Sequence, residues 1–225
     1  KAIFVGHDWG GMIAWAMPLR HPDRVAGVIG LNTPYTKRPE IDPIELYKQR
    51  FGPDMYIVRF QEPGVIDAIF DQDVKKTMQY FMRGPDISPT AFQARPAERR
   101  NLALQEALKR FKPENDTQQF LAEDELAYFT DRFSHTGFTG GINWYRNFTR
   151  NWERGGRFVD HVPHPALMIM AEMDVVLPPS AANGMEKYVP DLEKTLIAGS
   201  GHWTQQEKPD AVNAAISEWV KRRFG

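Results

Sequence analysis

The 225-residue chain has an ordinary globular composition, with 42% apolar residues, 25% charged residues and a formal net charge of −1. No basic excess favours nucleic acid as a partner, and the longest apolar runs are far too short to span a bilayer. Because the chain has no cysteine, disulfides, thiolate nucleophiles and cysteine metal sites are excluded.

The first 34 residues predict a βαβ unit. A strand over Ala2–Val5 is followed by a helix over Gly10–Arg20 and a second strand over Val25–Leu31. Between the first strand and the helix stands GHDWGG, residues 6–11. One reactive side chain among glycines, directly between a strand and a helix, is typical of a nucleophile elbow.

Residues 35–160 change character, because alternating patterns give way to amphipathic helical stretches separated by prolines. The predicted helices are Val65–Met82, Leu102–Phe111, Glu123–Thr136 and Ile142–Trp152. We expect this segment to be an all-helical cap.

From residue 161 the α/β alternation returns. It predicts strands over Ala166–Ala171 and Glu193–Ala198 and helices over Ser180–Tyr188 and Pro209–Arg223. Residues 1–34 and 161–225 would then form a single core interrupted by the cap.

Three reactive side chains each follow a predicted strand: Asp8, Asp174 and His202. In an open parallel sheet, catalytic groups lie just beyond the carboxyl ends of the strands. The chain order nucleophile, acid, histidine is that of the α/β-hydrolase triad. The sequence therefore predicts an α/β-hydrolase fold, a mostly parallel sheet with an inserted all-helical cap.

Each of these side chains also has a purely structural interpretation. Asp8 could cap a helix, Asp174 could be a turn residue, and His202 could be a solvated or structural histidine. The other histidines lack such a placement, and His7 should point away from the nucleophile because strand side chains alternate. We expect no metal site among the remaining four, which are His21, His135, His161 and His164.

An aspartate at the elbow indicates substitution at saturated carbon. A serine would form an ether there, whereas Asp8 would form an ester that water can hydrolyse. His202 would activate that water, with Asp174 orienting the imidazole. The substrate would be an alkyl halide or an epoxide, and an opening epoxide needs a proton donor such as Tyr56 or Tyr145. By periodicity alone, both tyrosines could equally serve packing.

Five short motifs resemble the hydrolase domain of soluble epoxide hydrolases: GHDWGG, LNTP at 31–34, FQEPG at 60–64, NWYRN at 143–147 and GHWTQ at 201–205. The resemblance implies the nucleophile, acid and histidine roles for Asp8, Asp174 and His202. It also implies two cap tyrosines that bind and protonate the epoxide oxygen. Tyr145 matches one of them directly, and Tyr56 matches the other by position, although its neighbours differ.

The resemblance also implies an oxyanion hole, with the backbone N–H of Trp9 as one donor. The family carries the second donor on a His-Gly-x-Pro loop before the elbow, and this motif does not occur in the chain. We therefore expect the chain to be a fragment without its N-terminal part. Phe60, Trp144, Met173 and Trp203 are expected to line an apolar pocket, although Trp203 could equally belong to the core.

The sequence thus predicts cofactor-free hydrolysis of a small hydrophobic epoxide to a vicinal diol, through an alkyl ester on Asp8. A haloalkane dehalogenase with the same nucleophile and a non-catalytic ligand-binding module remain alternatives. A homodimer is compatible with the sequence, and the cytoplasm is the default location for a chain without a recognisable targeting signal.

Overall fold

The computed structural model describes residues 1–225, which divide into two compact units. Unit 1 consists of residues 1–38, 84–92 and 156–225, and unit 2 of residues 39–83 and 93–155. The predicted cap, 35–160, contains all of unit 2 and also residues 35–38, 84–92 and 156–160, which group with unit 1. As a functional division, core and cap stay a prediction.

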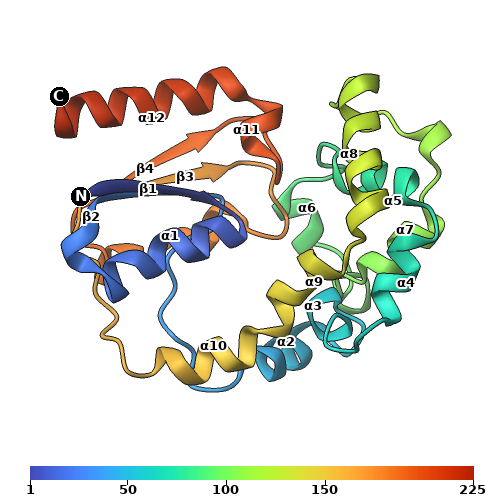
Figure 1. The fold of residues 1–225 in the computed structure, drawn as a ribbon, viewed down its shortest axis with the longest axis horizontal. Coiled ribbons are helices and arrows are strands. Elements are labelled where there is room, and N and C mark those ends of the chain that lie inside the picture. The colour runs from blue at the N-terminus through green and yellow to red at the C-terminus, as the bar shows by residue number, and fades with distance from the viewer. The chain divides into compact units, whose positions relative to one another are not determined.

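Unit 1 is built on a four-stranded sheet in the order β1-β2-β3-β4 (Figure 1). The strands are β1 (Ala2–His7), β2 (Val25–Leu31), β3 (Ala166–Ala171) and β4 (Leu192–Ile197). Every neighbouring pair is parallel, as predicted. The loops that carry Asp8, Asp174 and His202 therefore leave the sheet at one edge, beyond the carboxyl ends of β1, β3 and β4.

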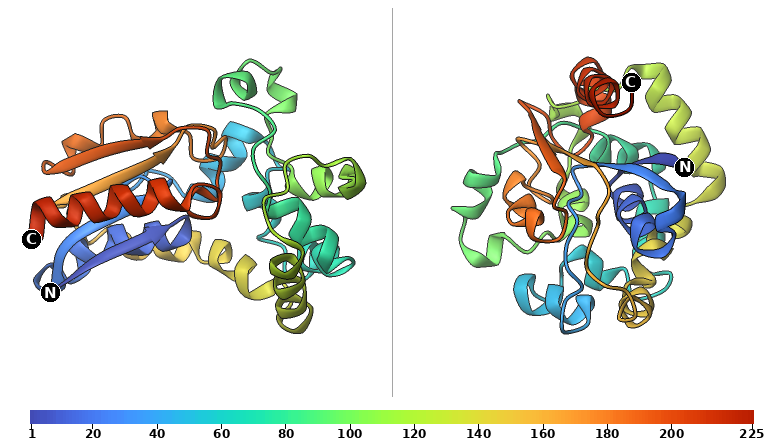
Figure 2. Two further views of the ribbon diagram at one scale, coloured as in Figure 1. Left: turned by 90° about the horizontal axis from the view of Figure 1, so that it is seen from above. Right: turned by 90° about the vertical axis from the view of Figure 1, so that its left-hand side faces the viewer.

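Helices cover both faces of this sheet. On one face Trp15 of α1 (Trp9–Arg20) packs with Val28 and Met168, and on the other Trp219 of α12 (Pro209–Phe224) packs with Leu167. The split follows from strand alternation, because neighbouring residues of one strand face opposite sides. The C-terminus of the chain, where α12 ends, lies at the same end of the sheet as the N-terminus, where β1 begins (Figure 2).

The remaining elements of unit 1 are short. They are η1 (Pro22–Arg24), α6 (Pro89–Gln93, in this unit up to Phe92), η4 (Pro179–Ala182), η5 (Met185–Lys187) and α11 (Thr204–Glu207). The predicted helix over Ser180–Tyr188 is wrong. Gly184, at φ 80°, interrupts the segment and leaves only two 3-10 turns.

Unit 2 is helical. Its helices are α2 (Pro43–Phe51), α3 (Tyr56–Arg59), α4 (Val65–Asp71), α5 (Val74–Phe81), α7 (Leu104–Arg110), α8 (Glu123–Thr136), α9 (Thr139–Arg146) and α10 (Phe148–Gly155), with 3-10 turns η2 (Ala97–Arg99) and η3 (Pro113–Asn115). Within the unit, α5 and α8 lie side by side (Figure 1).

Two predicted long helices of unit 2 are each broken in two. The expected helix 65–82 stops at Asp71 and restarts at Val74, because the Asp73 carboxylate caps α5 by accepting a hydrogen bond from the Lys76 N–H. The expected helix 142–152 is divided at Asn147, between α9 and α10. Periodicity predicted helix in both cases but did not locate the breaks.

The junction between β1 and α1 is too tight for a side chain at Gly6. A Cβ there would lie 2.0 Å from the carbonyl oxygen of Gly10, which belongs to the backbone and cannot move aside. A Cβ at Gly11 would lie 2.7 Å from the Cβ of Thr33. At Gly10, by contrast, nothing lies within 4 Å of an added Cβ. Two of the three elbow glycines are thus required by packing.

No helix combines the length and the apolar character that crossing a membrane requires.

The glycine contacts predict different effects of alanine substitution at Gly6 and at Gly10. Gly6→Ala should lower the free energy of unfolding by about 3 kcal/mol, because β1 and α1 must separate. Gly10→Ala is the matched control and should change it by less than about 1 kcal/mol, since alanine also favours the helix. Urea unfolding followed by circular dichroism measures both, and equal stabilities would contradict the close approach.

Candidate active site

Asp8 stands at the junction of β1 and α1 with a strained backbone, at φ 51° and ψ −119°. Such a conformation costs about 1–3 kcal/mol in a non-glycine residue and persists only where the surroundings enforce it. The Thr33 hydroxyl supports it by donating to the Asp8 carbonyl oxygen over 2.8 Å. Asp8 occupies the N-cap position of α1, yet its side chain makes no capping hydrogen bond. The helix-cap interpretation of this carboxylate is therefore wrong.

The Asp174 carboxylate is buried at 1% exposure and fully hydrogen-bonded. One oxygen accepts from the N–H groups of Val176 and Leu177, at 2.9 and 3.0 Å. The other lies 2.8 Å from Nδ2 of Asn32 and 2.9 Å from Nδ1 of His202. Burial alone would raise the pKa of Asp174, but the His202 charge and these hydrogen bonds lower it to about 2. Asp174 thus shapes its turn and also holds the histidine.

His202 lies between the two carboxylates. Its Nδ1 faces Asp174, and its Nε2 lies 3.7 Å from an Asp8 carboxylate oxygen. Burial opposes the charged imidazolium, but the Asp174 charge and hydrogen bond and the Asp8 charge outweigh burial. They raise the pKa of His202 to about 9. The arrangement therefore combines the Asp8 carboxylate, which makes no helix-capping hydrogen bond, with a histidine whose Nε2 is oriented toward it.

Asn32, which follows β2, fixes the acid and the histidine loop together. It is 1% exposed and has φ 59°, a left-handed conformation that asparagine tolerates. Besides Asp174, its Nδ2 lies within 3.3 Å of the carbonyl oxygens of Gly201 and His202. Its Oδ1 accepts from the Thr204 hydroxyl at 2.8 Å. One buried amide therefore sets the position of Asp174 relative to His202.

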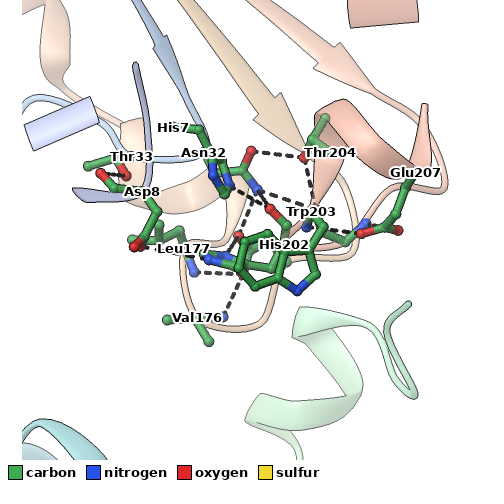
Figure 3. A network of polar contacts seen from close by, with 12 residues as sticks. His7, Asp8, Asn32, Thr33, Val176, Leu177, His202, Trp203, Thr204 and Glu207 are labelled. Carbon is green, nitrogen blue, oxygen red and sulfur yellow. Dashed lines mark hydrogen bonds and ion pairs between the residues drawn. The ribbon is translucent and has the colours of Figure 1, made fainter. Parts of the chain in front are cut away.

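Two further side chains hold the His202 loop. Glu207 accepts from the backbone N–H groups of Gly201 and Trp203, at 2.8 and 3.0 Å. His7 donates from Nε2 to the His202 carbonyl oxygen at 2.7 Å (Figure 3). Burial, followed by the His202 charge, lowers the pKa of His7, which favours the neutral imidazole.

Sequence reasoning gave no positioning role to Asn32, Glu207 or His7. The expectation that His7 points away from the site is wrong, because strand alternation ends where Asp8 leaves extended geometry. The signals available for Asn32 were its position directly after a buried strand and its place in the LNTP motif at 31–34.

Tyr56 and Tyr145 come together in unit 2. Tyr56 starts α3 and is buried, Tyr145 lies near the end of α9, and their ring centroids are 5.6 Å apart. Phe60 packs edge-on against both, at 5.4 and 5.0 Å. The structure thus pairs the two predicted tyrosines with each other in unit 2. In unit 1 it brings together Asp8, Asp174 and His202.

The other predicted site residues divide between the units in the same way. Trp9 is the first residue of α1, and the Trp203 ring lies 5.2 Å from that of His202. Met173 directly precedes Asp174 and donates its N–H to the Ser200 carbonyl oxygen. In unit 2, Phe60 is buried and Trp144 is 48% exposed. Their pocket and oxyanion roles stay predictions. No group of three or more His, Asp or Glu side chains is arranged to hold a metal ion.

Comparison with known proteins identifies the family. The protein-family model described as "alpha/beta hydrolase fold" matches residues 1–209 of the chain. Bifunctional epoxide hydrolase 2 of Rattus norvegicus is 36% identical over 226 residues, which cover 98% of this chain and 39% of the rat protein. Epoxide hydrolase A of Mycobacterium tuberculosis is 35% identical, over 98% of this chain and 69% of its own length.

A solved structure agrees with the sequence relatives. The crystal structure of epoxide hydrolase A from Mycobacterium thermoresistibile aligns with a TM-score of 0.81 and 36% identity, covering 98% of this chain and 69% of that one. The chain spans about two fifths of the rat relative and about two thirds of the mycobacterial proteins. With its parallel sheet and strained elbow, the chain belongs to the epoxide hydrolases of the α/β-hydrolase superfamily.

Proposed function

We propose that this chain carries an epoxide hydrolase activity, which adds water to a small apolar epoxide and releases a vicinal diol without a cofactor. The observation that carries the proposal is the geometry at the elbow. The Asp8 carboxylate makes no helix-capping hydrogen bond and lies 3.7 Å from Nε2 of His202, whose Nδ1 is paired with Asp174. The relatives are epoxide hydrolases, which supports the substrate class.

In the first step, a carboxylate oxygen of Asp8 attacks an epoxide carbon. The carbon–oxygen bond of the ring breaks, and its electron pair goes to the ring oxygen. That oxygen becomes an alkoxide unless it takes up a proton, which the phenol of Tyr56 or Tyr145 supplies. The product is a hydroxyalkyl ester of Asp8. This step requires the tyrosine pair of unit 2 to meet the elbow of unit 1 in the working enzyme.

In the second step, water attacks the ester carbonyl while Nε2 of His202 takes its proton. The bond between the carbonyl carbon and the diol oxygen breaks, and that oxygen takes the proton back from the His202 imidazolium as the diol leaves. The carboxylic acid left on Asp8 loses its proton to the solvent, which regenerates the carboxylate, and the phenolate recovers a proton from the solvent. We propose that the N–H of Trp9, at the start of α1, supports the charge on the carbonyl oxygen.

The raised pKa of His202 couples the two steps. Near neutral pH the imidazole is protonated beside two carboxylates and cannot act as a base. Formation of the ester converts the Asp8 carboxylate into a neutral group, so one cause of the raised pKa disappears. The pKa of His202 should therefore fall once the first step is complete, which is when a base is needed.

Removal of the base should trap the intermediate. In His202→Gln, an epoxide should alkylate Asp8 and remain attached, so intact-mass spectrometry should detect protein plus the whole mass of the epoxide. The same variant with Asp8→Asn is the control and should gain no mass. Absence of the adduct while the wild-type protein still forms diol would exclude the two-step route.

The same measurement separates the alternatives. If the chain is a haloalkane dehalogenase, the His202→Gln variant incubated with a haloalkane would gain the mass of the alkyl group alone and release halide, because the halide leaves in the first step. A binding module would retain an epoxide without a covalent adduct and without diol.

Loss of both phenols should slow ring opening. Tyr56→Phe and Tyr145→Phe should each reduce the single-turnover rate of ester formation, and the double variant should reduce it about 100-fold or more, since general acids contribute about 10²–10⁴-fold. Hydrolysis of the preformed ester should change little. Tyr128→Phe, an exposed phenol of α8 in the same unit, is the matched control. A double variant that forms the ester at the wild-type rate would remove the tyrosines from the mechanism.

The pKa of His202 should depend on the Asp8 charge. An ¹⁵N NMR titration should give about 9 for the wild-type protein and a lower value for Asp8→Asn, because removal of a nearby negative charge destabilises the imidazolium. Asp23→Asn, which alters an exposed carboxylate of unit 1, should leave the value unchanged. An unaltered pKa in Asp8→Asn would show that esterification does not release the base.

A further inference from the structure

Arg146 directly follows Tyr145 in the chain, and its side chain is only 15% exposed. Its guanidinium has five N–H groups, and each has an acceptor. Nε donates to the Phe60 carbonyl oxygen at 2.8 Å. Nη1 donates to Asn143 Oδ1 and Asp67 Oδ1, and Nη2 donates to Asp67 Oδ2 at 2.6 Å and to the Glu62 carbonyl oxygen at 3.3 Å.

These acceptors belong to separate elements of unit 2. Phe60 is the C-cap of α3, which begins with Tyr56, and Asp67 lies in the first turn of α4. Burial would raise the pKa of Asp67, but hydrogen bonds from Arg146 and Thr139 hold it below its ordinary value. The guanidinium therefore joins α9 to the end of α3 and the start of α4 through a buried ion pair.

Gln61 makes a second connection between the same two helices. Its Nε2 lies 2.8 Å from the Ile57 carbonyl oxygen in α3 and 3.2 Å from the Tyr145 carbonyl oxygen in α9. The backbone that carries Tyr145 is thus fixed directly to the helix that carries Tyr56. The 5.6 Å separation of the two rings follows from these connections as well as from the packing of Phe60.

We propose that Arg146, assisted by Gln61, is the positioning residue of the tyrosine pair and thereby sets the rate of epoxide ring opening. This inference rests on the proposed function, in which the two phenols protonate the epoxide oxygen. Arg146 does not touch the substrate. A lysine has three donors and no planar fork, so it can retain the charge but not all five contacts.

The test is the single-turnover rate of each step in Arg146→Lys. Ester formation should slow about 10- to 100-fold, because small displacements of a reacting group have effects of this size. Hydrolysis of the preformed ester should stay within about twofold, since that step uses Asp174 and His202 of unit 1. Arg150→Lys, on the neighbouring α10, alters an exposed arginine and should leave both rates unchanged.

A double-mutant cycle distinguishes positioning from a general loss of structure. With both tyrosines replaced by phenylalanine, Arg146→Lys should slow ester formation by no more than about twofold further, because its effect passes through the phenols. In ¹³C-tyrosine spectra, Arg146→Lys should shift the signals of Tyr56 and Tyr145 and leave that of Tyr128 unchanged. This readout does not depend on activity.

Gln61→Met provides a second variant without a buried charge, for the case that Arg146→Lys does not fold. It should slow ester formation less than Arg146→Lys does, again without affecting ester hydrolysis. The inference is overturned if a folded Arg146→Lys, or otherwise Gln61→Met, forms the ester at the wild-type rate, or if the slowing persists in the tyrosine-free background. Absence of diol and of any adduct with the unaltered tyrosines and arginine would instead refute the proposed function.

Discussion

The candidate chemistry of this chain depends on how closely β1 approaches α1. The positive φ of Asp8 is costly, and the contacts around Gly6 and Gly11 leave the backbone little alternative. Because the turn is so tight, the Asp8 side chain projects beyond the sheet instead of capping the helix that follows. The packing of the surrounding core thus holds the Asp8 carboxylate without a capping hydrogen bond, as its proposed role as nucleophile requires.

The acid and the histidine are held by a different device, a buried polar network. An ionised carboxylate at 1% exposure would be very costly without partners, and Asp174 accepts hydrogen bonds at both oxygens. Asn32 links this carboxylate to the backbone of the His202 loop, and Glu207 and His7 restrain that loop from other sides. The histidine can therefore turn little, although it belongs to a loop, and its Nε2 stays directed toward Asp8.

The sequence predicted the parallel sheet, the helices that flank it and the meeting of Asp8, Asp174 and His202, because strand patterns and glycines are local signals. It did not predict the breaks near Asp73 and Asn147, where capping and packing override helical periodicity. The contacts by which Asn32 and His7 position the site are long-range, with partners more than a hundred residues away in the sequence. Hydrophobic periodicity does not distinguish such an asparagine or histidine from its neighbours in the chain.

The two compact units use the same physical solution for two different tasks. In unit 1 a buried amide and carboxylate orient the imidazole of His202, and in unit 2 a buried guanidinium and carboxylate join the helices that carry two phenols. Since no residue is shared between these networks, disturbance of one need not disturb the other. In the proposed two-step reaction, the rate of ring opening and the rate of ester hydrolysis could then vary independently. The Asp8 charge connects them, because its loss in the first step lowers the pKa of the base used in the second.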